Sequence, residues 1–90
     1  MKELNEKLDK YLALTAKALE KVKIVQSRKK EAEDIIDLAK RYYEDAQYFY
    51  KKGDLVNAFG AVVYAHAFLD IGARIGLFDV GNDNKLFMVD

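Results

Sequence analysis

Cysteine and proline are absent from this chain of 90 residues, and serine, threonine and histidine occur once each. The absence of cysteine excludes disulfide bonds and thiolate metal sites. A folded chain with many turns normally contains proline, whereas a few long helices joined by short links do not need it. The sequence therefore points to a small helical protein that is not held together by disulfide bonds.

Charge of neither sign is in excess, because 15 Lys and Arg residues balance 15 Asp and Glu residues. No strong field draws the whole molecule onto nucleic acid or lipid headgroups. The first ten residues, MKELNEKLDK, lack the apolar stretch of a signal peptide. The longest apolar run, AFGAVVYAHAFL, is too short to span a bilayer. We therefore expect a cytoplasmic protein without membrane contact and without a cofactor.

Ninety residues are enough for one small domain, and a chain of this size buries only about 60% of its unfolded surface. The hydrophobic content of 51% is thus needed for a core. Apolar residues recur in steps of three and four, the period of an α-helix with one buried face. We expect an all-α fold over residues 1–90, a three-helix antiparallel bundle with helices at about 2–25, 28–52 and 54–75 and a short C-terminal tail, 77–90, packed on it.

The boundaries of the predicted helices depend on capping residues. Ser27 offers a hydroxyl to begin the second helix, although the basic residues that follow it have the wrong charge for a helix start. Gly53 suits the left-handed end of the second helix, Asp54 the cap of the third, and Gly76 its end. The first two helices each present one apolar seam: Leu4, Leu8, Tyr11, Thr15, Ala18, Val22 and Val25, and then Ala32, Ile35, Ala39, Tyr42, Ala46 and Phe49.

The predicted third helix is apolar around most of its circumference. Two opposite faces flank a line of small residues; they are Leu55, Phe59, Val62, His66, Leu69 and Ala73 on one side and Gly60, Tyr64, Phe68, Ile71 and Ile75 on the other. Two partner helices cover only part of such a cylinder, so a further body must cover the rest. The tail, with apolar residues on both sides of a turn at 81–84, is one candidate, and a second protomer is the other.

His66 and Asp70 form the one constellation in this helix that suggests chemistry. They lie one turn apart, which permits a hydrogen bond, and the tyrosines at 11, 42 and 43 are candidates to approach from other helices. The functional interpretation is a general base oriented by a carboxylate. The structural interpretation is a polar pair in the core that holds the helices in register. We favour the latter, because Ser27 and Thr15 lie elsewhere in the pattern and supply no nucleophile.

Basic residues cluster around the link between the first two helices, where Arg28, Lys29 and Lys30 are candidates for a nucleic-acid contact. Against that interpretation stand neighbouring glutamates and the absence of an interleaved aromatic residue for base stacking. A solvated turn explains the cluster more simply. We therefore do not expect nucleic acid to be the partner.

Tyr48 is the one tyrosine predicted on the outer side of the second helix. Tyrosine is favoured at interfaces because it combines a large apolar body with a polar tip. A simpler explanation is a ring that lies over Arg41 or Lys52. The candidate interface residues are Tyr48, Tyr64, Phe68, Ile71 and Ile75.

The run from Tyr42 to Val80, with its KKGD hinge, its NAFGAVVYAHAFLD helix and its GLFDV exit, resembles a small archaeal family, domain of unknown function three-five-seven. The resemblance implies a compact three-helix domain from an archaeon, with no assigned activity. The hinge is also similar to those of helical-hairpin repeats and three-helix trafficking modules, which favours protein binding. We expect a non-enzymatic helical module that binds a protein partner or forms a homo-oligomer, with a small nucleic-acid-associated protein as the alternative.

Overall fold

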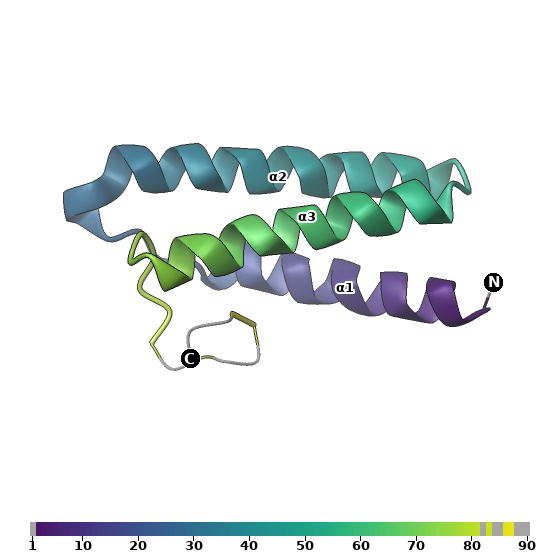
Figure 1. The fold of residues 1–90 in the computed structure, drawn as a ribbon, viewed down its shortest axis with the longest axis horizontal. Helices are drawn as coiled ribbons and strands as arrows, with labels where there is room; N and C mark the ends of the chain where they lie inside the picture. The colour runs from purple at the N-terminus through teal and green to yellow at the C-terminus, as the bar shows by residue number, and fades with distance from the viewer. Residues whose placement is uncertain (1, 82, 84–85, 88–90) are drawn as a thin grey trace.

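The computed structural model describes residues 2–81, 83 and 86–87. In these residues the chain forms α1 (Lys2–Lys21), a short 3-10 helix η1 (Gln26–Arg28), α2 (Lys29–Lys51) and α3 (Leu55–Arg74). The chain runs along α1, returns along α2 and turns again into α3, so that α2 is antiparallel to the other two helices (Figure 1). The predicted all-α antiparallel three-helix bundle is confirmed.

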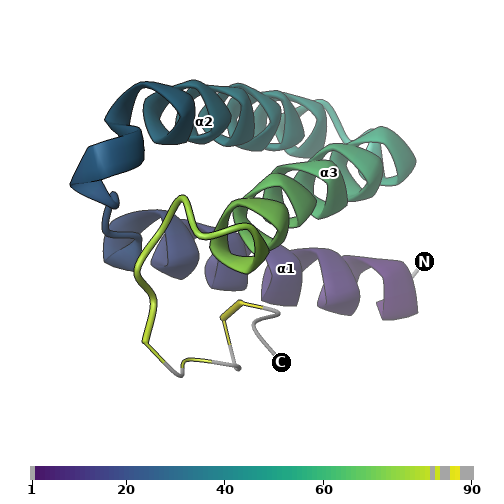
Figure 2. The same ribbon diagram turned by 60° about the vertical axis from the view of Figure 1, so that its left-hand side comes forward.

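The third helix is the central element of the bundle. It lies between α1 and α2 in both views (Figure 1 and Figure 2), packs most extensively against α2, and leaves α1 and α2 with little mutual contact. Small side chains permit this close approach, since the fully buried residues of α2 are three alanines. The buried line of α3 is Ala58, Val62, Ala65, Leu69 and Gly72.

The first helix ends earlier than predicted, at Lys21. The prediction that Val25 is helical is wrong, because the backbone after α1 pairs with the segment that follows α3. Ile24 forms an antiparallel bridge with Phe78. Two backbone hydrogen bonds flank this bridge, from Val25 N–H to the Leu77 carbonyl (2.9 Å) and from Asp79 N–H to the Lys23 carbonyl (2.8 Å).

The helix caps are as predicted at the hinge between α2 and α3 but not at the start of α2. Ser27 lies inside η1, and Arg28 occupies the N-cap position of α2 without a side-chain capping bond among the described residues. Gly53 adopts a left-handed conformation with φ +78°. The Asp54 carboxylate accepts hydrogen bonds from the backbone N–H of Asn57 (3.2 Å) and from its side-chain amide (2.7 Å).

The tail docks on the bundle, as predicted. Its side chains Leu77, Phe78, Leu86 and Phe87 are at most 6% exposed and join the core cluster that surrounds Leu69. The Phe78 ring packs so tightly on Gly72 that a Cβ atom at that position would overlap it. Met88 and Val89, which were predicted to dock with the rest of the tail, lie outside the described residues.

Candidate functional site

The outer surface of α3 is apolar and open to solvent. Val56 is 67% exposed, Tyr64 57%, and Ile71 and Ile75 51% each. The residues Val56, Gly60, Tyr64, Ala67, Ile71 and Ile75 follow one another at helical spacing along this surface, and we term them the α3 face. The described part of the tail covers a different side of α3, where Leu86 contacts His66, while Tyr64, Ile71 and Ile75 are exposed.

Phe68, predicted as an interface residue, is half-buried at the edge of the α3 face. Its ring stacks on that of Tyr42 from α2, with centroids 5.7 Å apart, and the Tyr64 ring meets Tyr42 edge-on at 5.1 Å. Such pairs hold aromatic rings in fixed orientations. Tyr42 and Phe68 therefore position Tyr64, whose exposed side faces solvent.

The α3 face contains two hollows. One, of about 190 Å³, is lined by Tyr64, Ala67, Phe68 and Ile71, and these four residues have the spacing of a hole that accepts one side chain of a packed helix. The other, of about 300 Å³, is lined by Asp70, Ile71, Arg74 and Ile75. The face is thus shaped like half of a helix–helix contact, with ionised groups only towards its C-terminal end.

Tyr48 lies apart from the α3 face, near the end of α2. Its side chain is 58% exposed, and the Lys52 ammonium is 5.5 Å from the centre of its ring. The predicted ring contact with Lys52 is therefore confirmed. A cation–π contact at an exposed position is worth about 0.5–1 kcal/mol, which is enough to orient the ring.

His66 is held by the tail and by α1. Its Nε2 atom lies 2.7 Å from the Leu86 carbonyl, and its Nδ1 atom lies 3.0 Å from the Thr15 hydroxyl. A carbonyl only accepts, so Nε2 carries a hydrogen and donates it to Leu86. When the ring is neutral, Nδ1 accepts from the Thr15 hydroxyl. The histidine thus joins three segments of the chain through both ring nitrogens.

The prediction that Thr15 lies elsewhere in the pattern is wrong, since its hydroxyl is a direct partner of the imidazole. Thr15 is fully buried, however, so its hydroxyl is not accessible to a substrate. Asp70 lies 3.7 Å from Nε2, too far for a hydrogen bond but close enough for an ion pair with a protonated ring. The described partners of the ring do not include a tyrosine.

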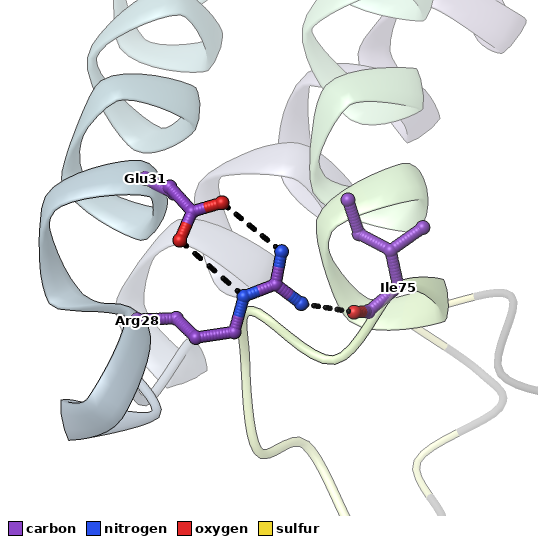
Figure 3. Close-up of polar contacts among 3 residues, drawn as sticks. All are labelled: Arg28, Glu31 and Ile75. Carbon is purple, nitrogen blue, oxygen red and sulfur yellow. Dashed lines mark hydrogen bonds and ion pairs between the residues drawn. The ribbon is translucent and has the colours of Figure 1, made fainter.

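The basic link between α1 and α2 is partly engaged in structural contacts (Figure 3). The Arg28 guanidinium donates to the Ile75 carbonyl at the end of α3 (2.9 Å) and to both carboxylate oxygens of Glu31 (3.1 and 3.4 Å). The hydrogen bonds with Arg28, reinforced by its charge, lower the pKa of Glu31, and the same contacts raise the pKa of Arg28. Lys29 and Lys30 are exposed.

Other side chains in the described part of the chain suggest little chemistry. No group of three or more His, Asp and Glu residues there is close enough to hold a metal ion. A hollow of about 640 Å³ beside the tail is lined by residues of both charges: Glu20, Lys21, Lys23, Asp79, Val80, Gly81, Asp83 and Phe87. This mixture does not match one class of ligand.

By length and composition alone, α3 is long and apolar enough to cross a membrane. The run AFGAVVYAHAFL, which is shorter than the helix, did not predict this. The inner side of the helix is packed against α1 and α2, and a core helix has the same length and composition. The opposite side of the helix is open to solvent at Val56, Tyr64, Ile71 and Ile75.

Comparison with known proteins places the chain in a family. A family described as "Protein of unknown function (DUF357)" matches residues 10–78, which include the second half of α1 and the whole of α2 and α3. No curated protein and no solved structure matches the chain. The chain belongs to the DUF357 family of proteins of unknown function.

Proposed function

We propose that the protein is a non-enzymatic interaction module that binds an apolar helix on the α3 face. The observation that carries the proposal is the exposure of Val56, Tyr64, Ile71 and Ile75 in one stripe, each more than half open to solvent. Soluble chains rarely present such a stripe unless a partner covers it. Helix-in-groove recognition uses anchors at this spacing.

The hollow between Tyr64 and Ile71 supports a helical partner over an extended one. Its four lining residues accept a side chain that projects from a second helix packed along α3. Tyr64 is the best candidate for the energetic centre of the contact, since aromatic residues held in place beforehand lose little entropy on binding. Its edge-on packing against Tyr42 provides that rigidity.

The polar core supports a role without catalysis. Both nitrogens of His66 are used in contacts with Thr15 and Leu86, and the Thr15 hydroxyl is buried. A general base needs a hydrogen-bonding position open to the substrate. The group is better suited to holding α1, α3 and the tail in register.

Nucleic-acid binding through the basic link is the weaker proposal. Arg28 would have to leave Glu31 and the Ile75 carbonyl to contact a phosphate, which leaves Lys29 and Lys30 as the remaining contacts. Two exposed lysines on a chain of zero net charge give little electrostatic affinity. We extend the proposal to a cytoplasmic location and an archaeal source, which agree with the charged first helix and the family resemblance.

The proposed function is tested by placing a photoreactive amino acid at Ile71, with a control at the exposed Glu44 of α2. Illumination of an extract of the source cells should give a discrete adduct from position 71 and none from position 44. Adding Ile75→Lys should reduce that adduct at least tenfold, because it places a charge on the α3 face. Equal adducts from both positions, or none from position 71, would contradict the proposal.

A further inference from the structure

We propose that the occupant of the α3 face is a second copy of this chain, packed antiparallel through its own α3 face about a two-fold axis. The inference rests on the proposed function and names its partner. It depends on four properties of the face: a glycine that the single chain does not need, a symmetric spacing of side chains, the position of its arginine, and the available apolar area.

No described contact within the single chain requires a glycine at position 60. Gly60 lies inside α3 without a left-handed backbone, and a Cβ atom added there would meet nothing within 4 Å among the described residues. Glycine inside a helix is unfavourable compared with alanine. Gly72, in contrast, is required by the Phe78 ring. Gly60 therefore suits close approach by something outside the chain.

The spacing of the α3 face reads the same in both directions along the helix. Its steps are 4, 4, 3, 4 and 4 residues from Val56 to Ile75. Two antiparallel copies placed in register therefore bring each side chain opposite another of the set. The facing pairs are Val56 with Ile75, Gly60 with Ile71, and Tyr64 with Ala67. In the two inner pairs a small residue, Gly60 or Ala67, faces a large one, Ile71 or Tyr64.

The hollows fit the same register. The hole lined by Tyr64, Ala67, Phe68 and Ile71 lies opposite Val63 and Tyr64 of the second copy, which project towards it. A two-fold axis requires that one patch complements itself, and here the knob and the hole belong to the same patch. A partner of different sequence would not require this symmetry.

Charge favours the antiparallel arrangement. Arg74 is the one positively charged side chain that lines the hollows of the face, and Asp70 lines the same hollow. A parallel pair would place the two Arg74 side chains together, whereas the antiparallel register separates them by roughly 25 Å along the axis. That separation exceeds the screening length of about 8 Å at physiological salt. Each Arg74 instead faces the uncharged Asn57 of the other copy.

The area of the face corresponds to a reversible dimer. At roughly 150–200 Å² for each large side chain, the exposed fractions of Val56, Tyr64, Ile71 and Ile75 leave roughly 350–450 Å² of apolar surface per chain. A standard interface buries about 800 Å² per partner, including its polar rim. The α3 face with its rim lies at the lower end of that class, so dimerisation should depend on concentration.

Sedimentation equilibrium of the purified chain of 90 residues tests this inference. The wild type should show a reversible monomer–dimer equilibrium between low micromolar and millimolar concentration. Ile71→Lys and Gly60→Leu should weaken it at least tenfold, because one introduces a charge and the other fills the position opposite Ile71. Tyr48→Lys, on α2, is the control and should leave it unchanged. A thermal melt of dilute Gly60→Leu should show a stable monomer, since leucine favours helix and a Cβ atom at this position has nothing within 4 Å.

The absence of native cysteine permits a direct test of register. The double variant Val56→Cys, Ile75→Cys should form a disulfide-linked dimer on mild oxidation. The two positions are roughly 28 Å apart within one helix, so they cannot bridge within a chain. Each single variant should remain unlinked, because its copies lie at opposite ends of the contact. Linkage of Val56→Cys alone would show a parallel pair and overturn the proposed register.

A monomer at every concentration would overturn the second-copy inference. If that monomer still gives the adduct from position 71 with another protein, the proposed function survives and only its partner changes. If it instead binds neutral phosphatidylcholine vesicles, and Ile71→Lys abolishes that binding, the face is a membrane contact and both proposals fail. A monomer with neither property also ends both.

Discussion

The contact between Thr15 and His66 shows how a single polar pair is accommodated in this small core. The two side chains come from α1 and α3 and are separated by 51 positions in the sequence, yet their polar atoms lie 3.0 Å apart. Thr15 occupies the buried seam of the first helix and His66 an inner face of the third, so each needed a polar partner. That shared need was the available signal for the pair. The sequence did not show that the Leu86 carbonyl takes the other nitrogen, because that contact depends on the path of the tail.

Replacing Thr15 with valine should destabilise the fold. The substitution keeps the shape of the side chain but leaves Nδ1 of His66 without its hydroxyl donor, at a cost of about 1–3 kcal/mol. Thr15→Ser keeps the hydroxyl and should cost less. Urea unfolding, followed by circular dichroism, measures both variants. A Thr15→Val protein as stable as the wild type would show that the hydrogen bond contributes nothing.

The two glycines inside α3 should respond in opposite directions to alanine. Gly72→Ala forces the Phe78 ring out of its packed position and should cost about 1–3 kcal/mol. Gly60→Ala meets open space and should stabilise the dilute monomer by about 0.5–1 kcal/mol. The matched pair separates packing from helix propensity, and urea midpoints at low protein concentration give the comparison. Equal effects of the two substitutions would contradict this assignment of their roles.

At the scale of the elements, periodicity predicted the helices well and their ends less well. The hinge at Gly53 and Asp54 follows from local chemistry, which the sequence contains. The end of α1 does not, because the backbone around Ile24 leaves the helix to pair with Phe78, far along the chain. Arg28 likewise replaces Ser27 at the start of α2, and its guanidinium caps the carbonyl end of α3. Tertiary contacts thus moved the boundaries that local rules placed elsewhere.

The junction of η1, α2 and α3 should depend on pH through Glu31. Its pKa is lowered in the folded state by Arg28, so its contribution to stability is fully present above the unfolded pKa, about 4.3, and is lost as pH falls through the folded value. The difference in unfolding free energy between wild type and Glu31→Gln should therefore shrink towards zero in acid. High salt should reduce it at neutral pH, because the pair is exposed. A difference that does not change with pH would exclude this contribution.

At the scale of the whole molecule, the sequence indicated that α3 has more apolar surface than two helices cover. In the structure, the tail covers one part of this apolar surface and leaves another part open to solvent. Leu77, Phe78, Leu86 and Phe87 bury one side of the bundle, which the apolar content of the tail allowed us to predict. The open stripe at Tyr64, Ile71 and Ile75 was expected from the helical wheel. The symmetry of the spacing about the midpoint between Tyr64 and Ala67 has meaning only once the open side is known.

The central claim is that the α3 face is covered in solution by a second copy of the chain. The most direct measurement is the relaxation of methyl groups by a soluble paramagnetic agent, recorded by NMR over a range of protein concentrations. The methyl groups of Ile71, Ile75 and Val56 should become protected as concentration rises, and Gly60→Leu should remove that protection. Methyl groups of these residues that stay equally accessible in the wild type from the lowest to the highest concentration would contradict the account.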